Sequence, residues 1–92
     1  MITAFLLMVC EPARIAEIGR GLADVNGIDE VYSTTGSNDF IAVVRVPDLA
    51  ALATLVTERV AALPGIRRTD THLAIRSYGR ADEAAAFDIG VD

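Results

Sequence analysis

The chain has 92 residues, which is enough for one small domain and too few for two. Hydrophobic residues make up 52% and charged residues 23%, a composition typical of a folded chain and not of a disordered one. The formal net charge is −5 and all eight basic residues are arginines, so the sequence lacks the strongly basic surface that nucleic acids and anionic lipids attract.

We expect neither a membrane span nor an export signal. No apolar run approaches the roughly 18 residues that a bilayer-spanning helix needs. The N-terminal run Ile2–Val9 has no basic residue before it and no small-residue cleavage site after it, which is unlike a signal peptide. The single cysteine, Cys10, cannot form a disulfide within the chain. These features predict a cytoplasmic protein with no membrane partner.

The chain opens with a predicted strand and helix. Ile2–Val9 is an apolar run of strand length, and Pro12 suits the first turn of a helix, where a missing N–H costs nothing. Apolar residues then recur at helical spacing, at Ile15, Ile18, Leu22 and Val25. The pair Asn26-Gly27 predicts the end of this helix.

Two strands and a turn are predicted next. Ile28–Thr34 is polar enough for an edge strand, and Thr35–Asp39 has the composition of a turn. Phe40–Val46 is rich in β-branched residues and predicts a buried strand that stops at Pro47.

A second helix and a last strand follow. Asp48 is a suitable N-cap for a helix whose expected apolar stripe is Leu49, Leu52, Val56, Val60 and Leu63. Pro64-Gly65 ends that helix, and Ile66–Ser77 predicts the last strand. We therefore expect one domain over residues 1–79 and a polar, Ala-rich tail over residues 80–92, with a short helix at Ala81–Phe87.

The order β-α-β-β-α-β predicts an α+β fold, the ferredoxin-like sandwich, in which two helices cover one face of an antiparallel sheet. The first and third strands are then central, and both are apolar on both faces. In the first strand Phe5, Leu7 and Val9 lie on one face and Ala4, Leu6 and Met8 on the other. In Phe40–Val46, Arg45 is the one residue that is not apolar. Because helices cover one face only, we expect a homodimer packed through the other.

Few residues offer catalytic chemistry. His72, the only histidine, has Asp70 two residues away on the same strand face, which permits a proton-transfer pair but also an ordinary polar edge. The negative charge of Glu11 would raise the pKa of the neighbouring Cys10 thiol. This favours a buried packing residue over a nucleophile. No cluster has metal-ligand spacing. The sequence therefore predicts no catalytic residue, no metal and no cofactor.

The polar segment between the second and third strands is the richest candidate for binding. The carboxylate of Asp39 could hold an ammonium group, and backbone amides near Gly36 could hold a carboxylate, so the segment suits a small zwitterion. Thr69 and Thr71 add hydroxyls on the last strand. The alternative is that this is an ordinary strand connection that binds nothing.

Two motifs give the chain a resemblance. Val31–Phe40 is similar to "V-Y-x-x-T-G-x-x-D-hydrophobic", and Leu63–Thr71 is similar to "L-x-G-V-x-x-T-x-T". Both motifs, in this βαββαβ order, resemble the effector-binding (RAM) domain of the Lrp/AsnC regulators over about residues 1–79. The resemblance implies a dimer built sheet to sheet, dimers assembled into a ring that is commonly octameric, and a free amino acid or similar metabolite bound between dimers. The ligand-binding residues that it implies are Tyr32, Ser33, Thr35, Gly36, Asn38, Asp39, Thr69 and Thr71.

Regulators of this family also carry an N-terminal helix-turn-helix domain, whereas this sequence starts at the first strand. We therefore expect a stand-alone sensor that does not bind DNA directly and that acts through another protein, such as a full-length relative. Two alternatives stay open. One is a structural assembly partner whose loop binds nothing. The other is a small dimeric α+β barrel enzyme of the cofactor-free monooxygenase type, which would need His72 in an apolar cavity.

Overall fold

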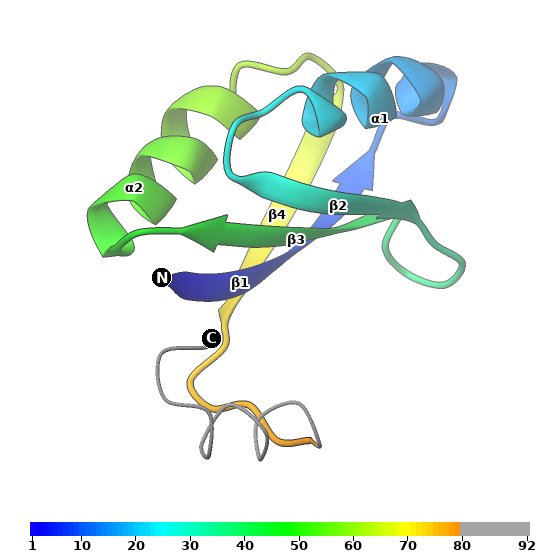
Figure 1. The fold of residues 1–92 in the computed structure, drawn as a ribbon. Coiled ribbons are helices and arrows are strands. Elements are labelled where there is room, and N and C mark those ends of the chain that lie inside the picture. Colours follow the sequence, from blue (N-terminus) through cyan, green and yellow to red (C-terminus); the bar gives the residue numbers. More distant parts are fainter. Residues whose placement is uncertain (80–92) are drawn as a thin grey trace.

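The computed structural model describes residues 1–79, which form a four-stranded antiparallel sheet with helices on one side (Figure 1). The strands are β1 (Ile2–Cys10), β2 (Ile28–Ser33), β3 (Phe40–Val46) and β4 (Ile66–Leu73), in the spatial order β2-β3-β1-β4. This order confirms the predicted ferredoxin-like sandwich with the first and third strands at its centre. The helix expected at Ala81–Phe87 lies outside the described residues.

The first helical segment begins with one 3-10 turn, Pro12–Arg14, and continues as α1 (Ile15–Ala23). It ends earlier than expected. The Asp24 N–H donates to the Gly21 carbonyl at 3.2 Å and the Val25 N–H donates to the Leu22 carbonyl at 3.1 Å, which closes the helix before Gly27 is reached. Gly27, with φ +104°, instead turns the chain into β2, and its carbonyl accepts from the Arg45 backbone N–H at 2.9 Å.

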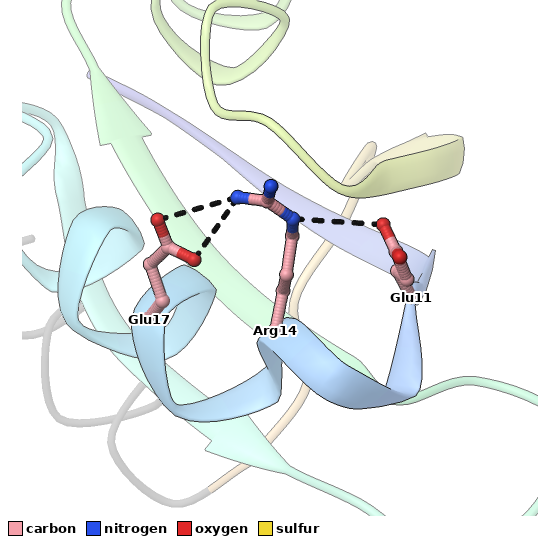
Figure 2. A network of polar contacts seen from close by, with 3 residues as sticks. All are labelled: Glu11, Arg14 and Glu17. Carbon is pink, nitrogen blue, oxygen red and sulfur yellow. Dashed lines mark hydrogen bonds and ion pairs between the residues drawn. The ribbon is translucent and has the colours of Figure 1, made fainter.

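Arg14 lies between the segment that follows β1 and the turn that precedes β4. Its guanidinium pairs with Glu11 at 3.6 Å and with Glu17 at 3.2 Å (Figure 2). The backbone N–H of Glu11 donates to the Gly65 carbonyl at 2.7 Å. Gly65 has φ +96°, and a Cβ there would lie 2.7 Å from Cδ of Arg14, so the Arg14 stem packs directly on the turn before β4.

The second helix begins as an α-helix and continues as a π-helix. α2 spans Leu49–Thr54, with Asp48 Oδ1 accepting from the Ala51 N–H at 2.8 Å as its predicted N-cap. The next segment, Leu55–Val60, is a π-helix. Its wider turn buries Leu55 and Val60, which are five residues apart, together with Leu52. The expected stripe is therefore partly wrong, because Leu49 is 61% exposed and Val56 is only partly buried.

One face of the sheet forms the core. Its buried residues alternate along both central strands and pack against Ile18, Leu22, Leu52, Leu55 and Val60 of the helices. They are Ala4, Leu6, Met8 and Cys10 on β1, and Phe40, Ala42, Val44 and Val46 on β3. α1 lies close to this face at Gly19, where an added Cβ would be 3.3 Å from the Phe40 ring.

Within residues 1–79, no helix covers the opposite face (Figure 1). We call it the open face, and its apolar residues are Phe5, Leu7, Val9, Ile41 and Val43. Phe5 is 39% exposed and the others are partly buried. β4 ends at Leu73 and not at Ser77, and just beyond it the Ala74 N–H donates to the Thr3 carbonyl at 2.9 Å.

Candidate functional site

The connection between β2 and β3, residues 34–39, is a closed hairpin loop. The Thr34 N–H donates to the Asp39 carbonyl at 3.0 Å, and the Thr34 hydroxyl donates to the Asn38 carbonyl at 3.0 Å. Gly36 at its tip has φ +98°, and apart from its two chain neighbours no heavy atom of the described residues lies within 4 Å of the position of its missing Cβ. The base of the loop is thus fixed by hydrogen bonds while its tip faces open space.

Asp39 connects this loop to the end of β1 through two hydrogen bonds. Its backbone N–H donates to the Met8 carbonyl at 2.8 Å, and its Oδ2 atom accepts from the Cys10 N–H at 2.7 Å. The register of β1 against β4 shifts between Val9 and Cys10, so this carboxylate supplies an acceptor beside an irregular point of the sheet. Oδ1 accepts no hydrogen bond from residues 1–79.

Cys10 is buried against the same carboxylate. Burial, and then the negative charge of Asp39, raise the pKa of the Cys10 thiol above its usual range. A neutral buried thiol is a poor nucleophile, which agrees with the predicted role of Cys10 as a packing residue.

Tyr32 and Ser33 lie on β2 next to the loop. Tyr32 is opposite Ile41, so it belongs to the open face, while Ser33 is opposite Phe40 and belongs to the helix side. The Tyr32 hydroxyl donates to Glu30, and this hydrogen bond and the charge of Glu30 raise the pKa of Tyr32. The two residues therefore flank the loop from opposite faces of the sheet.

Thr69 and Thr71 lie at the far edge of the sheet. They are opposite Met8 and Leu6 on β1, which places them on the helix side of β4, where both are exposed. Only β1 lies between Thr69 and the end of the loop, because Thr69 pairs with Met8, whose carbonyl accepts from the Asp39 N–H.

His72 and Asp70 do form the predicted pair, with 3.0 Å between Nε2 and Oδ2. They are opposite Phe5 and Leu7, so the pair borders the open face. Three clefts of about 440, 470 and 200 Å³ among residues 1–79 are lined by other residues and not by His72. Within the same residues no group of three His, Cys, Asp or Glu side chains could hold a metal ion.

The comparison with known proteins agrees with this architecture. Residues 3–83 match the family model of the Lrp/AsnC ligand-binding domain. The chain belongs to the Lrp/AsnC ligand-binding domain family. Its curated relatives include an uncharacterised helix-turn-helix-type transcriptional regulator of Pyrococcus abyssi, 32% identical over 82 residues. That match covers 87% of this chain and 52% of the relative, so the chain spans about half the length of the curated relatives it matches.

Several solved structures share the fold of this Lrp/AsnC domain. The protein TTHA0845 of Thermus thermophilus is 41% identical, with a TM-score of 0.83, and the match covers 87% of this chain and 100% of that chain. The hypothetical protein PHS023 of Pyrococcus horikoshii is 31% identical, with a TM-score of 0.77, and the match covers 87% of this chain and 96% of that chain. The fold neighbours also include a feast or famine regulatory protein of M. tuberculosis complexed with L-methionine, 21% identical with a TM-score of 0.72 over 87% of this chain and 54% of that chain.

Along the part of the chain that the structure describes, no helix is long and apolar enough to cross a membrane. The sequence motifs found the loop and the two threonines of an Lrp/AsnC domain. They gave no sign that Asp39 also holds the amide of Cys10, because a contact between residues 29 positions apart has no local pattern.

Proposed function

We propose that this Lrp/AsnC domain is a sensor that binds a free amino acid at residues 34–39 and acts by assembling with other copies of its family. The observation that carries the proposal is the hydrogen bonding of the Asp39 carboxylate. Its carboxylate is fixed in place by the Cys10 amide through Oδ2 while Oδ1 stays available. A fixed carboxylate with one available oxygen, next to an open glycine tip, suits the ammonium group of an amino acid.

Assembly supports the same proposal. The open face presents Phe5, Leu7, Val9, Ile41 and Val43 together, and a second copy packed sheet to sheet would cover them. A further ring contact between such dimers, commonly of four dimers, would bring Thr69 and Thr71 of one copy to residues 34–39 of another. We infer that the amino-acid site is completed only in this assembly, with Tyr32, Ser33, Thr35 and Asn38 around it.

The sensor would reach DNA through a partner. A net charge of −5 disfavours direct binding of this chain to the phosphates of DNA. Mixed assembly with a helix-turn-helix regulator of the same family would supply one. Co-expression with such a regulator, followed by size-exclusion chromatography, should give a joint peak if this step is right.

The test is a thermal-shift screen against the twenty amino acids, L-methionine included, with light scattering on the same samples. A ligand present at 100 times its Kd adds about 2.7 kcal/mol to stability, so a genuine effector gives a clear shift. The shift should disappear in Asp39→Asn, since the amide can still accept from the Cys10 N–H but carries no charge. Binding that is unchanged in Asp39→Asn would overturn the loop assignment.

The same screen separates the second candidate function, a structural assembly partner. That function predicts a stable assembly that no amino acid stabilises. The uncovered apolar residues of the open face favour assembly in either case, and only a selective, Asp39-dependent shift distinguishes a sensor.

A further inference from the structure

A cleft of about 440 Å³ lies between α2 and the end of β3, far from the candidate amino-acid site. Clefts of about 300–1,000 Å³ are the usual size for small-molecule sites. Residues 34–39 precede β3, whereas Val46 and Pro47 at the opposite end of this strand line the cleft. Seven strand residues at about 3.3 Å each separate the two places by about 20 Å.

The lining of this cleft combines an apolar wall with one available cation. Val46, Pro47, Ala50, Ala51 and Leu55 form the wall. The polar lining residues are Asn26, Arg45, Thr54 and Arg59, and no acidic residue is among them.

The two arginines differ. The Arg45 guanidinium is already paired with Asp29 at 3.0 Å and with Glu30 at 3.8 Å. Arg59 makes no ion pair with any residue from 1 to 79. Arg59 is therefore the group that could bind an anion in this cleft.

The π-helix explains why Arg59 lines the cleft together with Thr54. In an α-helix, residues three or four apart share a side, and a residue five positions on points elsewhere. The wider π turn, visible in the Ala61 N–H to Val56 carbonyl bond of 3.3 Å, brings residues five apart onto one side. Thr54 and Arg59 are five apart. Short π segments are rare and often occur at functional sites, which is independent support for a site here.

We propose that this cleft binds a small aliphatic carboxylate that carries no ammonium group. Arg59 binds the carboxylate, the Thr54 hydroxyl and the Asn26 amide donate to its oxygens, and the aliphatic chain packs on Ala50 and Leu55. An α-amino acid is disfavoured, because its ammonium group would meet an arginine and no carboxylate. This second site is independent of the proposed amino-acid site.

The experiment uses 3-methylbutanoate as the probe and the ¹⁵N-labelled full chain as the target. Titration should shift the amide signals of Asn26, Gly27, Ala51 and Thr54, and leave those of residues 34–39 in place. The uncharged amide 3-methylbutanamide should cause no such shifts, and L-leucine, with the same side chain and an ammonium group, should also fail to shift these four signals.

Two variants complete the test. Arg59→Gln should weaken 3-methylbutanoate binding at least about tenfold, because a charge-assisted pair is lost. Arg20→Gln, which removes an exposed arginine of α1, should leave binding unchanged. Ala50→Leu should also block binding by filling the cleft, and its exposed position makes this change compatible with folding. Equal binding by wild type and Arg59→Gln, or no cleft shifts at millimolar probe, overturns the proposal whatever the amino-acid screen shows.

Discussion

The carboxylate of Asp39 accepts a hydrogen bond from the backbone N–H of Cys10 at 2.7 Å, across 29 residues of sequence. The residue that best suits an ammonium group is thus also part of what holds the β2–β3 loop against β1. Loss of binding and loss of structure would be confused in a simple alanine variant.

Asp39→Ala and Asp39→Asn should therefore differ in stability. Alanine leaves the partly buried Cys10 N–H without its acceptor, which costs about 1–3 kcal/mol, whereas asparagine keeps an oxygen there and should cost less. Urea unfolding of both variants measures the difference. Equal stabilities would mean that the Cys10 contact contributes nothing, and amino-acid binding should be lost in both.

Val43→Lys and Val44→Lys test which face of β3 mediates assembly. Val44 is fully buried under the helices, so a lysine there should prevent folding. Val43 is on the open face opposite Glu30, where a lysine gains an opposite charge, so this variant should stay folded. Circular dichroism and light scattering should show a folded monomer for Val43→Lys. A folded Val43→Lys dimer would place the interface elsewhere.

Stability should fall at alkaline pH because of Cys10. Its pKa is raised in the folded protein, mainly by burial and then by Asp39, so the contribution is full below the unfolded pKa. As pH rises from about 8.5 through the higher folded pKa, the unfolded chain releases the proton first and stability decreases. Urea midpoints measured between pH 7 and pH 9.5 should show this slope. The slope should be shallower in Cys10→Ala, and an identical slope would assign it to another group.

Gly27→Ala and Gly36→Ala separate backbone strain from packing. Both glycines have a positive φ, +104° and +98°, so alanine is strained at each by about 1–2 kcal/mol. At Gly36 the new methyl group meets nothing, while at Gly27 it would lie 2.8 Å from Leu55 and 3.0 Å from Val46. Gly27→Ala should therefore be the more destabilising variant by about 1–3 kcal/mol. Similar unfolding free energies would show that Leu55 and Val46 move aside easily.

The parts of the fold that the sequence predicted are those with a local cause. β3 begins at Phe40 and ends at Val46 as expected, because its β-branched run is bounded by a polar turn and a proline. Asp48 caps α2 for an equally local reason. The stripe of the second helix was partly wrong because a π turn has no sequence signature, and one extra residue per turn moves every later side chain around the helix.

In the candidate sites, too, some features have a local sequence pattern and others depend on the tertiary fold. The motifs identified residues 34–39 and the threonines of β4, but sheet order, not local sequence, decides that β1 lies between Asp39 and Thr69. The cleft beside Arg59 has no motif at all, since it is lined by the α1–β2 turn, the end of β3, α2 and the π segment together.

The apolar open face, which a second copy would cover, has a consequence for measurement. If the amino-acid site is completed between copies, as proposed, the number of such sites depends on how many contacts between copies exist. Diluting the protein would then remove the site as effectively as mutating it. For that kind of ligand, an affinity has meaning only together with the protein concentration at which it was determined.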